Sequence, residues 1–226
     1  VVRTLSPIRI IGDGSVISQE TVKMRRARGD FVKAVEAREN AYSDPVSALT
    51  YALRSSATSP QQCAELAKGA FLNVDAAGEH IRVLVEQGVA VLLPGERYVH
   101  ADAVKAVCDE LVSELGRMHD AAPLSMGFAK KDLLREIKAD RLVVDKAIEL
   151  LLGAGRIAQS TAGYLIPVRA PKLSAGQAAL AAKICELYRR TGFASPRSDE
   201  LPEKVGAPAT VLKPVFDFLV QAGELV

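Results

Sequence analysis

Apolar positions recur at helical spacing in three stretches of the chain, and each stretch closes in the same way. An apolar run leads into Gly88, Gly155 and Gly223, which are 67 and 68 residues apart. A leucine lies 22 residues before each of these glycines, a span that holds two helices and a turn. Repetition at this period predicts an array of small helical modules, each of which stacks on its neighbours.

The first repeat, residues 44–101, predicts three helices and a hairpin. Helix starts are indicated at Asp44, which precedes a proline, at Ser59 with Gln62 as a capping box, and at Asn73. Gly88 supplies the left-handed residue that ends the third helix. Residues 89–93 and 97–100, on either side of a Pro-Gly turn, then read as two strands. Three helices followed by a two-stranded hairpin is the winged-helix plan.

The second repeat (102–169) and the third repeat (170–226) show the same order. Ser174 and Gln177 form another capping box at the start of the third repeat, and its hairpin is missing. Pro214 predicts a late start or a kink in the last helix. We therefore expect a mainly α fold with small β wings, built from tandem winged-helix modules in an extended row.

The N-terminal segments differ from the repeats. Residues 1–18 read as strand, with a turn signal at Asp13-Gly14, and two short strands cannot be stable alone. They predict the terminal strands of a sheet in a mostly missing domain. Residues 19–43 predict a linker helix with a short basic run.

Charge and composition narrow the function. The net charge is +2, with −2 in the first repeat, zero in the second and +1 in the third. A module that binds a phosphate backbone by itself is strongly basic. The first two repeats lack an excess of positive charge, so they are interpreted as spacers or protein contacts. The cations Arg189, Arg190, Arg197 and Lys213 make the third repeat the best candidate for RNA or ribosome contact.

The sequence carries no sign of an active site. No phosphate-binding loop and no Cys-x-x-Cys pair occur. The three histidines lack spaced metal-ligand partners and are interpreted as surface or capping residues. We expect no enzyme activity, cofactor or metal in this chain, no membrane segment, and a reducing cytoplasm.

Three motifs carry a resemblance to a known family. Residues 6–14, SPIRIIGDG, are similar to the stretch that closes the last β-barrel of bacterial selenocysteine-specific elongation factors. Residues 173–196 resemble the segment that opens the family's third winged helix, and residues 150–157 resemble a matching helix end. The resemblance covers essentially the whole chain, in order.

This resemblance implies a role in selenocysteine insertion at UGA. It implies that residues 1–18 end a barrel, and that GTP, Mg and selenocysteinyl-tRNA bind a missing N-terminal part. It further implies that the partners are an mRNA hairpin and the ribosome, and that the hairpin is read chiefly by a missing fourth winged helix. We expect the chain to be a monomer. A DNA-binding winged-helix regulator and a winged-helix scaffold for protein interactions remain alternatives.

Overall fold

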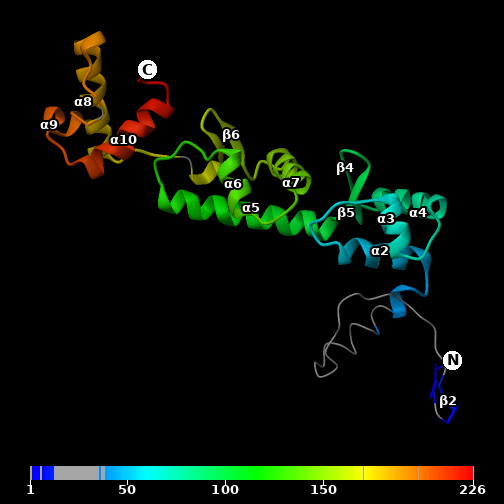
Figure 1. The fold of residues 1–226 in the computed structure, drawn as a ribbon. Helices are drawn as coiled ribbons and strands as arrows, with labels where there is room; N and C mark the ends of the chain where they lie inside the picture. The colour runs from blue at the N-terminus through cyan, green and yellow to red at the C-terminus, as the bar shows by residue number, and fades with distance from the viewer. Residues whose placement is uncertain are drawn as a thin grey trace. The chain divides into compact units, whose positions relative to one another are not determined.

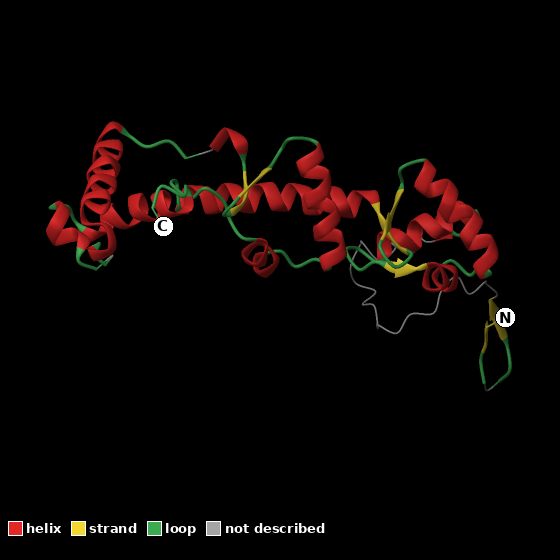
Figure 2. Ribbon diagram, turned by 90° about the horizontal axis from the view of Figure 1, so that it is seen from above, coloured by secondary structure: helices red, strands yellow, loops and turns green. Residues whose placement is uncertain are grey.

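The computed structural model is mainly helical with small sheets, as the sequence predicts (Figures 1 and 2). It describes residues 2–5, 7–12, 36, 39–169, 171–197 and 199–225. The chain divides into two compact units, Val1–Ala101 and Asp102–Val226. The predicted turn at Asp13-Gly14, the strand after it and most of the linker helix over 19–43 lie outside the described residues.

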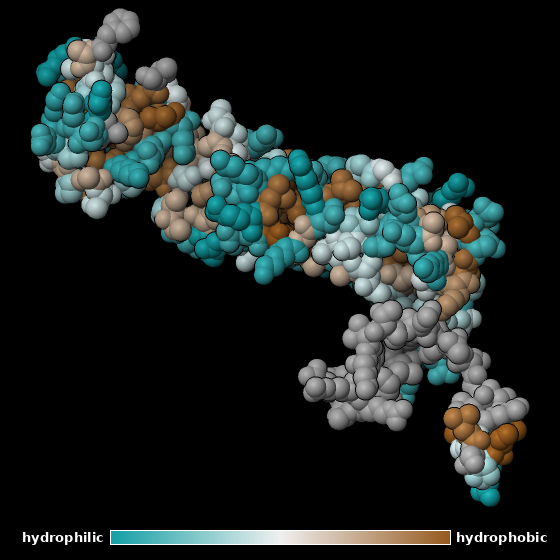
Figure 3. Space-filling model, viewed as in Figure 1, coloured by the Kyte–Doolittle hydropathy of each residue, from teal (hydrophilic) through white to brown (hydrophobic). Residues whose placement is uncertain are grey.

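The N-terminal hairpin exposes apolar side chains. Strands β1 (Val2–Arg3) and β2 (Ile10–Gly12) are antiparallel, and the Thr4 backbone N–H donates to the Arg9 carbonyl across the turn. Ile8, Ile10 and Ile11 are each more than 60% exposed, and apolar residues of this hairpin appear as brown patches in Figure 3. Two strands cannot bury such residues between them, so these side chains stay exposed to solvent.

The first repeat folds into three helices and a small sheet. Its elements are α2 (Pro45–Ser55), β3 (Gln61–Gln62), α3 (Cys63–Gly69), α4 (Val74–Glu86), β4 (Ala90–Leu93) and β5 (Arg97–His100). Asp44 and Asn73 cap α2 and α4 as predicted, and Gly88 has a φ of +72°. A shared core holds Leu49, Leu53, Leu66, Ile81 and Leu84.

The capping box predicted at Ser59 is wrong. Helix α3 begins only at Cys63, and the Glu65 carboxylate accepts from the Gln62 backbone N–H at 2.8 Å. Gln61 and Gln62 pair with Tyr98 and Arg97 of β5, so the sheet order is β3-β5-β4. This pairing holds the backbone extended and delays the helix.

The second repeat has the same order around a longer first helix. Its elements are α5 (Ala101–Ala121), α6 (Lys130–Glu136), α7 (Arg141–Gly153), β6 (Ala158–Ser160), β7 (Gly163–Leu165) and the 3₁₀ turn η1 (Pro167–Arg169). β6 and β7 are antiparallel. Phe128 forms an isolated bridge to Tyr164, which ties the segment before α6 to the hairpin.

The third repeat consists of helices. They are α8 (Ala175–Thr191), the 3₁₀ turn η2 (Gly192–Ala194), α9 (Leu201–Val205) and α10 (Ala209–Gln221). The capping box of Ser174 and Gln177 is present as predicted. Helix α10 begins at Ala209 and contains Pro214, so the late start is wrong, whereas the alternative of a kink at Pro214 stays a prediction.

Candidate nucleic-acid interface

The four predicted contact residues lie on the surface of the third repeat, and two of them line different pockets. Arg189 and Arg190 are in the last turn of α8, Arg197 precedes α9, and Lys213 is on α10; all are exposed. Arg190 lines a shallow pocket of about 230 Å³ together with Lys183 and Lys204. Lys213 lines a different and larger pocket.

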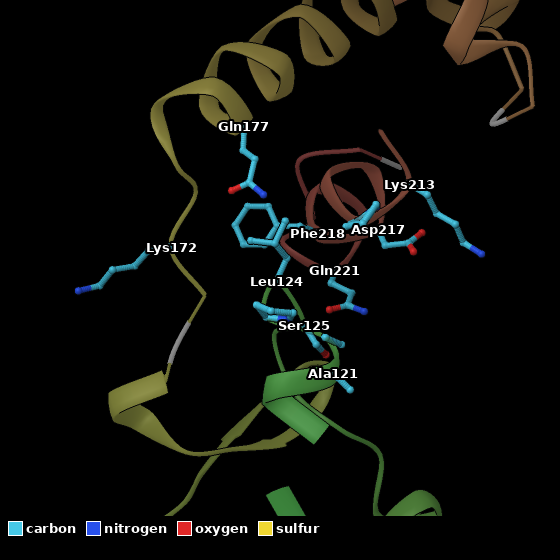
Figure 4. A pocket seen from close by; sticks show the side chains of 12 residues that line it. Ala121, Leu124, Ser125, Lys172, Gln177, Lys213, Asp217, Phe218 and Gln221 are labelled. Carbon is cyan, nitrogen blue, oxygen red and sulfur yellow. The ribbon is translucent and has the colours of Figure 1, made fainter. Parts of the chain in front are cut away.

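The larger pocket has a volume of about 550 Å³ and lies where the second repeat passes into the third. Below, it is called the joint pocket. Figure 4 shows the Phe218 ring and the carboxamides of Gln177 and Gln221 facing it, and Lys172 and Lys213 extending from opposite sides. Its lining consists of Ala121, Ala122, Pro123, Leu124, Ser125, Lys172, Gln177, Lys213, Pro214, Asp217, Phe218 and Gln221.

The charges around the joint pocket are mixed but favour anions slightly. Lys172 and Lys213 are cationic and exposed, and Asp217 is their one acidic counterpart in the lining. Lys172 was not singled out from the sequence, where it is an isolated cation after a proline. Only the return of α10 to the end of α5 places it and Lys213 on the same pocket.

Two tertiary contacts hold the joint together. Leu124, in the segment after α5, is 8% exposed and packs in the core of the third repeat with Ile184, Val215 and Leu219. The side-chain oxygen Oε1 of Gln221 accepts from the Met126 backbone N–H at 2.9 Å. The end of α10 is therefore fastened to the segment that leaves α5.

The third helices of the first two repeats are poorly suited to phosphate contact. Asp75 and Glu79 are exposed on α4 and would repel phosphates. On α7, Asp145 pairs with Lys130 at 2.7 Å, and Lys146 pairs with Glu149 at 2.7 Å. Charges that are already paired attract a phosphate backbone less strongly.

The interpretation of the histidines as surface or capping residues is wrong for two of them. His100 is buried, and its Nε2 accepts from the Arg54 Nε–H at 3.1 Å. His119 is also buried, and its Nε2 accepts from the Ile166 backbone N–H at 3.2 Å. The His119 ring meets the Phe128 ring edge to face, with centroids 5.0 Å apart. Both histidines are structural, because the helices and hairpins close over them.

The second repeat is expected to lose stability in mild acid through His119. Burial and, to a smaller extent, the Arg169 guanidinium lower the pKa of His119, while Asp120 opposes them. Below the ordinary value of about 6.5, the unfolded chain binds a proton that the folded chain resists. Stability therefore falls as the pH drops through this window, by at most about 1.4 kcal/mol per pH unit.

Urea unfolding between about pH 7 and pH 5 measures this effect. His119→Gln keeps a hydrogen-bond acceptor for Ile166 but does not titrate, so its stability should depend less on pH. Equal pH slopes for the two proteins would contradict the assignment.

Within the described residues, no group of three or more His, Cys, Asp or Glu side chains could hold a metal ion. None of the described helices is both long enough and apolar enough to cross a membrane. No protein-family model matches the chain, and no curated protein matches its sequence significantly. The function is therefore inferred from the motifs of the chain and from its geometry.

Proposed function

We propose that this chain is the connector region of a selenocysteine-specific translation elongation factor. Residues 1–18 are then the terminal strands of a barrel domain, residues 19–43 a linker helix, and the three repeats tandem winged helices in an extended row. The three helices and hairpin found in each of the first two repeats support this architecture. The exposed apolar hairpin near the N-terminus supports the barrel segment.

The observation that carries the proposal is the joint between the second and third repeats. Leu124 comes from the segment after α5 yet lies in the core of the third repeat, and Gln221 is bonded to Met126. Contacts of this kind transmit position from one module to the next. The acidic surface of α4 and the paired charges of α7 also favour an arm over a reader of nucleic acid.

In this proposal the chain itself performs no catalysis. It links a GTPase body, which carries GTP, Mg and selenocysteinyl-tRNA, to a module that reads the mRNA hairpin on the ribosome. It works as a monomer in the cytoplasm. Arg189, Arg190, Arg197 and Lys213 supply its own contacts to RNA or ribosome.

A titration with RNA and DNA tests the proposal. A selenoprotein mRNA hairpin and a DNA duplex of equal length are titrated with this chain, and with this chain joined at its C-terminus to the hairpin-reading module of a bacterial family member. We expect only the joined protein to bind the hairpin tightly, with a preference over DNA of roughly 10³-fold or more.

Two other outcomes would replace the proposal. Tight binding of duplex DNA by this chain alone would indicate a winged-helix regulator. If neither protein binds either nucleic acid, the chain is better explained as a scaffold for protein interactions. Titration at several salt concentrations separates phosphate attraction from base recognition.

A further inference from the structure

We propose that the joint pocket binds an unpaired nucleotide of a single RNA strand. In this arrangement the base lies against Phe218, and the phosphates on either side of it approach Lys172 and Lys213. Only the identification of the strand as mRNA rests on the proposed function. The binding of a nucleotide follows from the pocket itself.

The size and the apolar lining of the pocket suit a base. Its volume of about 550 Å³ lies within the range of roughly 300 to 1,000 Å³ that is usual for small-molecule sites. Leu124, Pro214 and Phe218 supply apolar surface. The Phe218 ring is only half-buried, so one part packs on the core of the third repeat and another part faces the pocket. Bases stack on aromatic rings in this way with little dependence on sequence.

Two oriented carboxamides add hydrogen-bond donors. The Gln177 Oε1 accepts from the Ser174 backbone N–H at 3.0 Å, and the Gln221 Oε1 accepts from the Met126 backbone N–H at 2.9 Å. Each bond fixes which end of the amide is the oxygen and turns the NH₂ group to the other side. Donors held in this way suit the carbonyl oxygens and ring nitrogens of a base.

The charges suit a strand that passes across the pocket. Lys172 and Lys213 project from opposite sides of it, so that each can meet a different phosphate (Figure 4). Asp217 lies on α10, four residues after Lys213, and weakens this attraction. A modest, salt-sensitive affinity is the expected result.

The first experiment measures the binding of labelled ribohexanucleotides of each base to the whole chain by fluorescence anisotropy, from about 50 to 200 mM salt. Lys172→Ala and Lys213→Ala should each weaken binding about fivefold and lower the salt slope by about 0.7. Lys105→Ala is the matched control, because Lys105 is an exposed lysine of α5 that lines neither this pocket nor the pocket of Arg190. This control should change neither quantity.

Two further variants test whether the base lies against Phe218 and whether the negative charge of Asp217 opposes binding. Phe218→Leu keeps an apolar side chain against the core and removes the ring, so binding should weaken fivefold or more. Thermal unfolding checks that this variant is folded. Asp217→Asn removes a repelling charge and should strengthen binding about threefold.

Several results would overturn the inference. They are the absence of binding by all four hexanucleotides, equal effects of the pocket variants and Lys105→Ala, weaker binding by Asp217→Asn, and mononucleotides that bind as tightly as the strand. If hexanucleotides bind this chain but the joined protein does not bind the hairpin, the nucleotide site is supported and the role in translation is contradicted. If the joined protein binds the hairpin but hexanucleotides do not bind this chain, the role in translation is supported and the nucleotide site is contradicted.

Discussion

Replacing Gly163 with alanine is expected to destabilise the second repeat by about 3 kcal/mol or more. Gly163 has a φ of +131°, a conformation that L-residues rarely adopt. An added Cβ would lie 2.5 Å from the Phe128 carbonyl carbon, which is a backbone atom and cannot turn aside. The Phe128–Tyr164 bridge, with N–H···O distances of 2.8 and 2.9 Å, would have to open.

Urea unfolding followed by far-UV circular dichroism measures the loss, and hydrogen exchange at Phe128 and Tyr164 locates it. Gly153→Ala is the matched control, because Gly153 is in α7 and an added Cβ meets nothing within 4 Å. Because Gly153 is the last residue of that helix, alanine should raise its stability by no more than about 0.5 kcal/mol. If Gly163→Ala is as stable as the parent, the close approach of β7 to Phe128 does not exist in solution.

Truncating Leu124 to alanine is expected to cost about 2–4 kcal/mol, which is the usual range for a buried leucine. The lost contacts belong to the core of the third repeat, although Leu124 itself follows α5. The variant should therefore loosen α8 and α10 and weaken the bond between Gln221 and Met126. The proposed connector depends on this joint. In the variant, the position of the third repeat relative to the second repeat should therefore become less defined.

Hydrogen exchange read by mass spectrometry checks this expectation, with faster exchange in peptides from α8 and α10 and no change in the first repeat. Leu150→Ala serves as control, because Leu150 is 46% exposed and its truncation should cost no more than about 0.5 kcal/mol. Similar effects of the two truncations would show that Leu124 does not anchor the third repeat.

The helix ends were predictable because they depend on neighbours in the sequence. Asp44 and Asn73 accept from backbone amides three residues ahead. Ser174 and Gln177 satisfy each other across one turn. Such contacts need no distant partner, so spacing and residue type were enough.

The failed prediction at Ser59 shows where that reasoning ends. Its sequence fits a capping box, but Gln61 and Gln62 find partners in β5, more than thirty residues away. Pro214 does not delay the start of α10 for a similar reason, because the burial of Val215 and Leu219 holds the helix together around it. Tertiary burial outweighs a local preference of this size.

The sequence alone determined the repeat, the mainly helical class, the helix caps at Asp44, Asn73 and Ser174, and the cations of the third repeat. Tertiary structure decided which histidines are buried, that Leu124 belongs to the next core, and that Lys172 and Lys213 share the joint pocket. The physical reason is how far apart in the sequence the interacting residues lie. Caps and turns are set by residues a few positions apart, whereas burial and pockets depend on which distant segments the folded chain brings together.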